Sequence, residues 1–170
     1  MDKIKSFDPI VDINSKILIL GSMPGNMSLE KGEYYAHLRN HFWRIIFDLF
    51  NEPYQDDYAG KLEFLLVHGI AVWDVIAECR REGSLDARIS DEKPNEIVEL
   101  LKSFSGIEVI MFNGLKAYQS YKKMVGFDKK PDVTYIRLPS TSPIPTRRIR
   151  TYEDKLAEWK IIYAYVSEKD

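Results

Sequence analysis

The feature of the sequence that most limits its fold is a continuous apolar run, Lys16-Ile-Leu-Ile-Leu-Gly21, which ends in glycine. Such runs are typical of a parallel strand buried on both faces of a sheet, because neither face presents polar residues to water. Three similar runs follow, at 69–73, 107–112 and 133–138. The chain therefore has four candidate strands for one short sheet.

Helical patterns separate these apolar runs. Apolar residues recur at helical spacing over 40–50, 58–68, 94–104, 114–125 and 151–167. Thr151, with Asp154 three residues later, predicts a capped start for the last helix. Strands that alternate with helices predict an α/β fold. We expect a three-layer α/β/α sandwich with a short, central, mainly parallel four-stranded sheet.

Length and composition indicate one globular domain. The 170 residues fit a single domain over 1–170, and 45% hydrophobic with 29% charged residues is typical of globular proteins. No apolar run approaches the roughly 20 residues of a membrane helix, and the N-terminus leads into no apolar signal core. We therefore expect a cytoplasmic monomer that does not associate with membranes.

The single cysteine, Cys79, excludes several classes of protein. It rules out an internal disulfide, a zinc ribbon and a cysteine-ligated iron–sulfur cluster. His37 and His41 are four residues apart, but no HExxH motif surrounds them. Structural imidazoles are favoured over a metal site, and we expect neither a metal nor another cofactor.

Charge is unevenly distributed along the chain. Residues 116–150 hold nine basic residues and two aspartates, which gives this segment +7 and the rest of the chain −9 for a net charge of −2. A local basic strip can neutralise DNA phosphates while the remaining surface stays acidic. Charge alone favours a nucleic-acid surface and an ordinary solvated face equally.

Ligands of parallel sheets bind at the carboxyl ends of the strands. Here four short loops follow the expected strands, at 21–25, 73–74, 113–114 and 139–143. Gly21-Ser-Met-Pro-Gly25 lacks both the GK[ST] ending of a P-loop and the GxSxG elbow of serine hydrolases. The loop at 139–143 is stiff and rich in hydroxyls, so it suits either a phosphate contact or a plain turn.

Together, five segments resemble the uracil-DNA glycosylase superfamily. They lie at 19–25, 35–43, 69–75, 112–118 and 138–143, in the order of the family, and the similarity extends from Lys16 to about Tyr165. The similarity is strongest to the hypoxanthine-DNA glycosylase branch, which is related to the mismatch-specific uracil and thymine-DNA glycosylases. It implies a base-excision-repair enzyme that flips a deaminated base out of DNA and hydrolyses its glycosidic bond, with hypoxanthine favoured over uracil. It also implies an abasic product without strand cleavage.

Two positions depart from related branches. Met23 stands where the mismatch-specific branch has a water-positioning asparagine and where uracil-excising members carry an aspartate in the motif. In the hypoxanthine branch the polar role passes to the asparagine of the Arg-Asn-x-Phe-Trp stretch, which is Asn40 here. Ile144-Pro145-Thr146 replaces the alanine and asparagine that often follow Pro143 in that branch.

The resemblance assigns roles to individual residues. Asn40 is the expected catalytic residue, and His37 assists it. Tyr35 is expected to stack on the flipped base, and Asp74 to accept a hydrogen bond from N1–H of hypoxanthine or N3–H of uracil. The complete base-binding set is Tyr35, Asp74, Ser22, Met23 and Asn113. The DNA-binding set is Ser140, Thr141, Ser142, Ile144, Arg147 and Arg148.

Each of these roles has a structural alternative. Tyr35 could seal the core, Asp74 could cap a following helix, and Asn40 could only cap the helix after it. For the whole protein, the alternatives are a nucleic-acid-binding module without catalysis, suggested by Met23, and a hydrolase that uses Ser22 as its nucleophile.

Overall fold

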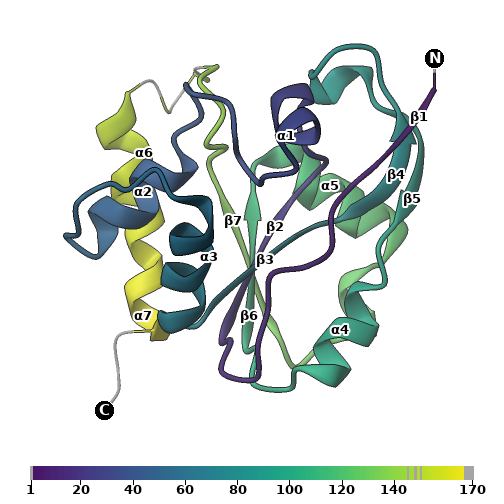
Figure 1. Cartoon of the computed structure of the whole chain (residues 1–170). Coiled ribbons are helices and arrows are strands. Elements are labelled where there is room, and N and C mark those ends of the chain that lie inside the picture. Colours follow the sequence, from purple (N-terminus) through teal and green to yellow (C-terminus); the bar gives the residue numbers. More distant parts are fainter. Residues whose placement is uncertain (1, 145, 148, 150, 167–170) are drawn as a thin grey trace.

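A computed structural model of the chain describes residues 2–144, 146, 147, 149 and 151–166. Its centre is a parallel sheet of four strands in the order β3-β2-β6-β7 (Figure 1). The strands are β2 (Ile17–Gly21), β3 (Ile70–Asp74), β6 (Val109–Asn113) and β7 (Thr134–Leu138). The four strands expected from the apolar runs are confirmed, and β2 is buried along its whole length.

Helices cover both faces of the sheet (Figure 1). One layer consists of α2 (Phe42–Leu49), α3 (Tyr58–Val67), α6 (Tyr152–Trp159), the 3₁₀ turn Lys160–Ile162 and α7 (Tyr163–Val166). The other contains α4 (Ile97–Ser103) and α5 (Leu115–Met124). Ile17 and Ile19 of β2 pack into the first layer, whereas Leu18 and Leu20 pack into the second. The period of two along a strand thus builds two cores, and the three-layer prediction is confirmed.

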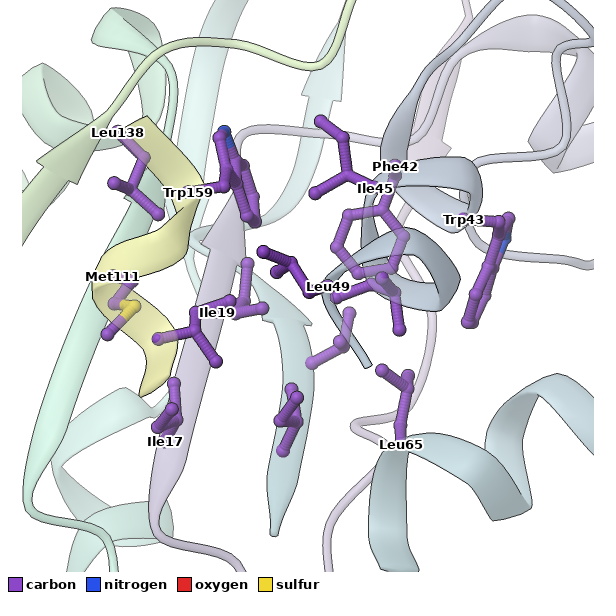
Figure 2. Close-up of a cluster of buried hydrophobic side chains, with 14 of the residues drawn as sticks. Ile17, Ile19, Phe42, Trp43, Ile45, Leu49, Leu65, Met111, Leu138 and Trp159 are labelled. Atoms are coloured by element: carbon purple, nitrogen blue, oxygen red, sulfur yellow. The ribbon is translucent and has the colours of Figure 1, made fainter. Parts of the chain in front are cut away.

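The first core is the more aromatic of the two. Figure 2 shows Trp159 of α6 and Phe42 of α2 above Ile19 and Met111 of the sheet. The two rings meet edge to face with centroids 6.1 Å apart. The indole N–H of Trp159 donates to the carbonyl of Pro139 at 2.9 Å. The core therefore also fixes the start of the loop that follows β7.

A second, antiparallel sheet was not expected from the sequence. It consists of β1 (Lys3–Lys5), β4 (Ile76–Arg80) and β5 (Ser90–Pro94), with β4 in the middle. Cys79 is buried on it, against Met23 and Ile76. The connection from β4 to β5 contains a 3₁₀ turn, Asp86–Arg88, which reaches back toward the loop after β2. Short helices at Asn26–Lys31 (α1) and Phe127–Lys129 complete the fold.

Several boundaries differ from the expected ones. The helix expected from residue 40 begins at Phe42, and His41 takes the cap position instead of Asn40. The helix expected from residue 94 begins at Ile97, because Pro94 pairs with Ile76 as the end of β5. The capping box of Thr151 and Asp154 is confirmed, although the last helix is interrupted by the 3₁₀ turn.

The buried position of Trp159 leads to a stability prediction. Changing Trp159 to Ala removes a fully buried ring and its bond to Pro139, so we expect unfolding to become easier by about 3–5 kcal/mol. Trp159→Phe keeps an aromatic ring and should cost clearly less. Urea denaturation of the purified variants measures both values. Equal stability of the alanine variant and the wild type would contradict this account of the core.

Candidate active site

The candidate site forms around Gly21, the last residue of β2. A Cβ atom at this position would lie 2.7 Å from Asp74 Oδ1 and 2.9 Å from the Tyr35 hydroxyl. Both distances are shorter than ordinary carbon–oxygen contact, so a side chain at this position would displace Asp74 or Tyr35. Gly21 therefore lets two polar side chains approach the backbone at the carboxyl edge of the sheet.

Asp74 is the last residue of β3 and is only 3% exposed. Its Oδ2 atom is buried and has no hydrogen-bond partner among the described residues. Burial, and after it the negative charge of Asp86, raises the pKa of Asp74 to about 7, although Arg81 acts in the opposite direction. The alternative role as a helix cap is wrong, because strand β4 follows directly.

Tyr35 lies in the loop before α2 with φ of 54°, a left-handed conformation that is uncommon for a residue other than glycine. One face of its ring stacks on Phe42, with centroids 4.0 Å apart and planes 20° from parallel. Its hydroxyl is enclosed near Asn113 and makes no hydrogen bond of normal geometry with the described residues. Burial is the main reason why the pKa of Tyr35 is raised.

Ser22 follows Gly21 and is held by the connection between β4 and β5. Its hydroxyl donates to Asp86 Oδ1 at 2.8 Å. Burial raises the pKa of the Asp86 carboxyl, while the hydrogen bond from Ser22 and the charge of Arg81 lower it. The Ser22 hydroxyl is thus bonded to an acid rather than to a histidine base, which gives no support to a nucleophilic serine.

Arg81 and Met23 fix the same loop from the side of the small sheet. Nη2 of buried Arg81 donates to the carbonyl of Pro24 at 2.7 Å, and its Nε donates to Gly83 at 2.8 Å. Met23 is 7% exposed and packs against Ile76 and Cys79. Its side chain thus serves the core of the small sheet, and its expected contact with the base stays a prediction.

Asn113, at the end of β6, is bonded to the loop after β7. Its Nδ2 donates to Thr141 Oγ1 at 3.1 Å, and its Oδ1 accepts from the Thr141 N–H at 2.9 Å. Thr141 is 1% exposed. The amide of Asn113 therefore bonds the loop at 139–143. Among the other expected base-binding residues, its side chain lies near Tyr35.

Asn40 and His37 belong to the turn that leads into α2. Asn40 is half-buried, and its Oδ1 accepts from the N–H of Phe42 at 2.9 Å. That bond leaves its Nδ2 without a partner among the described residues. His37 is exposed, and its Nδ1 accepts from the N–H of Arg39. The neighbouring His41 N–H donates to Thr141 at 2.9 Å, which joins this turn to the 139–143 loop.

Sequence reasoning missed a buried lysine beneath that loop. Lys155 of α6 is 4% exposed, and its Nζ donates to the carbonyl of Ser142 at 2.5 Å. The same nitrogen lies 3.2 Å from Nδ1 of His41. No carboxylate pairs with Lys155 within the described part of the chain. Burial lowers the pKa of Lys155, and burial together with Lys155 lowers that of His41.

The remaining DNA-binding candidates that the structure describes range from half-buried to exposed. Ser140 Oγ accepts from the N–H of Ser142, so its hydroxyl shapes the loop. Ile144 is 59% exposed, and Arg147 is exposed as well. Arg148 lies outside the described residues. Lys116, in the basic segment, is instead paired with Glu92 at 2.9 Å.

Two cavities lie away from this cluster. One of about 710 Å³ is lined by residues that precede β2 and end α3, including Asp12 and Leu66, at the opposite edge of the sheet. The other, of about 440 Å³, lies between the N-terminal segment and α3. Neither collects the unpartnered polar groups found at Gly21. The described residues contain no group of three His, Cys, Asp or Glu side chains arranged for a metal, and no helix suited to cross a membrane.

Comparison with known proteins agrees with this arrangement. Residues 9–164 match the Uracil DNA glycosylase superfamily. The chain belongs to the uracil-DNA glycosylase superfamily. The resemblance that the five sequence segments indicated is therefore confirmed, and with it the assignment as a DNA glycosylase.

Individual relatives cover most of this glycosylase. A hypoxanthine DNA glycosylase of Methanosarcina barkeri is 37% identical over 131 residues, which are 75% of this chain and 83% of the relative. A hypoxanthine DNA glycosylase of Methanosarcina acetivorans is 34% identical over 164 residues, 95% and 98% of the two chains. A solution NMR structure from M. acetivorans, provisionally named a uracil DNA glycosylase, superposes with a TM-score of 0.82 at 30% identity, covering 98% of this chain and all of the other.

The bonds of Asn113 lead to a second prediction. Asn113→Ala leaves buried Thr141 without two partners, so we expect a loss of about 1–3 kcal/mol in stability and weaker binding of the glycosylase to DNA. Asn113→Asp still accepts from the Thr141 N–H and is the matched control, with a smaller loss. Thermal unfolding and fluorescence anisotropy with a labelled duplex provide the two measurements. An alanine variant as stable as the aspartate variant would speak against the anchoring role.

Proposed function

We propose that this glycosylase removes hypoxanthine from DNA, with uracil as the second substrate, and leaves an abasic site without cutting the strand. The observation that carries the proposal is the 34% identity, over nearly the whole chain, to a hypoxanthine DNA glycosylase. The polar groups gathered at Gly21 support it, because they lie at the edge where parallel sheets bind ligands. We propose further that the enzyme works as a monomer in the cytoplasm.

The reaction requires the base to leave the duplex, because the stacked glycosidic bond is out of reach of protein groups. Flipping costs a few kcal/mol and is cheapest for a mispaired base such as a deaminated one. We propose that Ile144 fills the gap that the flipped base leaves in the duplex, because its apolar side chain is exposed. Ser140, Thr141 and Ser142 lie beside the strand, and Arg147 and Arg148 add contacts to phosphates.

In this proposal the flipped base stacks on Tyr35. Phe42 supports one face of the Tyr35 ring, so the other face is the one offered to the base. Base–aromatic stacking contributes about 1–3 kcal/mol. Asp74 contacts the edge of the base, and Asn113, Ser22 and Met23 complete the surroundings.

Asn40 is the proposed catalytic residue, and His37 assists it. Breaking the bond places positive charge on the sugar and negative charge on the leaving base. Asn40 Oδ1 accepts from the Phe42 N–H, and Nδ2 has no partner among the described residues, so Nδ2 is the group available to the base or to a water. The partly positive start of α2 also favours a developing anion.

The second candidate function is a DNA-binding module of the same fold without catalysis. Met23 favours this candidate, because a thioether packed on Ile76 and Cys79 cannot orient a water. Excision assays separate the two functions directly.

The decisive experiment is a panel of duplexes that each contain one damaged base. After incubation with the protein, alkali cleaves abasic sites, and gel analysis measures the product. We expect product from hypoxanthine, less from uracil, and none before alkali treatment. Binding to all duplexes without any product would establish the second candidate function instead.

Asn40 is tested by a variant that keeps its structural bond. Asn40→Asp retains the acceptor for the Phe42 N–H but loses the Nδ2 donor. We expect single-turnover excision of hypoxanthine to slow by about 100-fold to 1000-fold, as for the loss of one oxyanion donor, at an unchanged melting temperature. Asn40→Ala serves as the comparison, because it loses the structural bond as well. A normal rate for Asn40→Asp would return the catalytic role to other residues.

A further inference from the structure

Asp74 differs from an ordinary base-reading carboxylate in its surroundings. Its side chain is buried, and Oδ2 has no partner among the described residues. The ionisable groups that face it come from two directions. Tyr34 and Tyr35 approach from the loop before α2, and Arg81 and Asp86 approach from the small sheet.

These neighbours favour the protonated form of Asp74. Burial disfavours the charged form, and the negative charge of Asp86 disfavours it further. Arg81 opposes both effects but does not cancel them, and the pKa of Asp74 is about 7. Near pH 7 the protonated and charged forms of Asp74 are therefore both populated, and the protonated form donates a hydrogen bond as well as accepting one.

A buried donor suits a purine better than a pyrimidine. Hypoxanthine carries an imidazole nitrogen, N7, that accepts a proton, whereas uracil has no ring nitrogen of that kind. We propose that Asp74 gives its proton to N7 of the flipped hypoxanthine as the glycosidic bond breaks, and that Asp86 keeps this proton on Asp74 beforehand. This inference rests on the proposed excision of hypoxanthine and assigns Asp74 the role of general acid.

The step balances without a cofactor. The C1′–N9 electron pair enters the imidazole ring, N7 takes the proton from the Asp74 carboxyl, and neutral hypoxanthine leaves. A water oxygen then bonds to C1′, and its released proton returns to the Asp74 carboxylate. The products are hypoxanthine and an abasic sugar, and the acid is restored for the next turnover.

Asp86 acts through Asp74 and is a positioning residue. Its Oδ1 accepts from the hydroxyl of Ser22 at 2.8 Å, so the Asp86 carboxyl lies beside the residue that follows Gly21. The 3₁₀ turn that carries Asp86 connects β4 and β5. The small sheet thereby sets the protonation of a residue in the large one.

The pH dependence of single-turnover excision tests this arrangement. With a hypoxanthine duplex, the wild-type rate should fall about tenfold per pH unit above pH 7, because only protonated Asp74 is active. Asp74→Asn should be slower by about 100-fold or more and should lack this decline. Asp86→Asn removes the negative charge that raises the pKa of Asp74, so the decline in rate of this variant should begin at lower pH. Asp56→Asn, an exposed carboxyl elsewhere, is the matched control and should keep the wild-type profile.

A modified substrate identifies the atom that receives the proton. A duplex with 7-deazahypoxanthine lacks the N7 acceptor, so the wild type should lose about the same factor as Asp74→Asn loses on hypoxanthine. Asp74→Asn should lose nothing further on the modified base. Uracil excision should show no decline tied to Asp74. Rapid wild-type excision of the 7-deaza base, or a pH profile unchanged in Asp74→Asn, would overturn the proposal.

Failure of this inference is distinguishable from failure of the proposed function. A protein that removes hypoxanthine with a flat pH profile keeps the function and refutes the acid. Thermal unfolding gives a readout that needs no excision. Since the pKa of Asp74 is raised in the folded state, its contribution to stability is complete below about pH 4 and is lost as the pH rises through 7. Asp74→Asn should remove this part of the pH dependence, and an unchanged dependence would also overturn the proposal.

Discussion

The absence of a side chain at Gly21 is the constraint on which the site depends. β2 is buried on both faces and has β3 and β6 as its two neighbours, so any ligand at its carboxyl end must approach along the backbone. Gly21 lets Asp74 and the Tyr35 hydroxyl occupy the space that a Cβ would fill. The chain leaves β2 toward one helical layer and β6 toward the other, which opens the sheet edge between them. Gly21 therefore both ends the central strand and leaves the room that the site requires.

Much of this arrangement could be predicted from the sequence because the signals were local. Continuous apolar runs identified all four parallel strands, and the loops after them held Ser22, Asp74, Asn113 and Thr141, which lie at the carboxyl edge of the sheet. The capping box of the last helix could be predicted in the same way. Asn40 was correctly expected at the start of α2. It lies one position before the N-cap residue His41, and its Oδ1 accepts from the N–H of Phe42.

The rest depended on contacts between distant segments. Lys3–Lys5 alternates but has only three residues, and Ser90–Pro94 is polar throughout most of its length, so neither stretch identifies a strand and the small sheet was not predicted. Asp86 meets Ser22 across 64 positions of sequence, and Lys155 meets His41 across 114. No local sequence pattern indicates contacts between residues so far apart. The apolar stretch from Val75 through Ala77 to buried Cys79 was the signal that could have extended the chain into β4.

Acidic and basic side chains lie on different sides of the site. Next to the small sheet, the charge of Asp86 disfavours a phosphate, whereas protonated Asp74 suits a neutral base. On the side of α6, buried Lys155 supports the 139–143 loop with a positive charge that pairs with no carboxylate of the described residues. In the proposed binding mode, a DNA strand that crosses the site has its phosphates over the 139–143 loop and its flipped base at Asp74. In that mode the positive charge of Lys155 beneath the loop attracts the strand backbone and keeps its phosphates away from the acidic side chains.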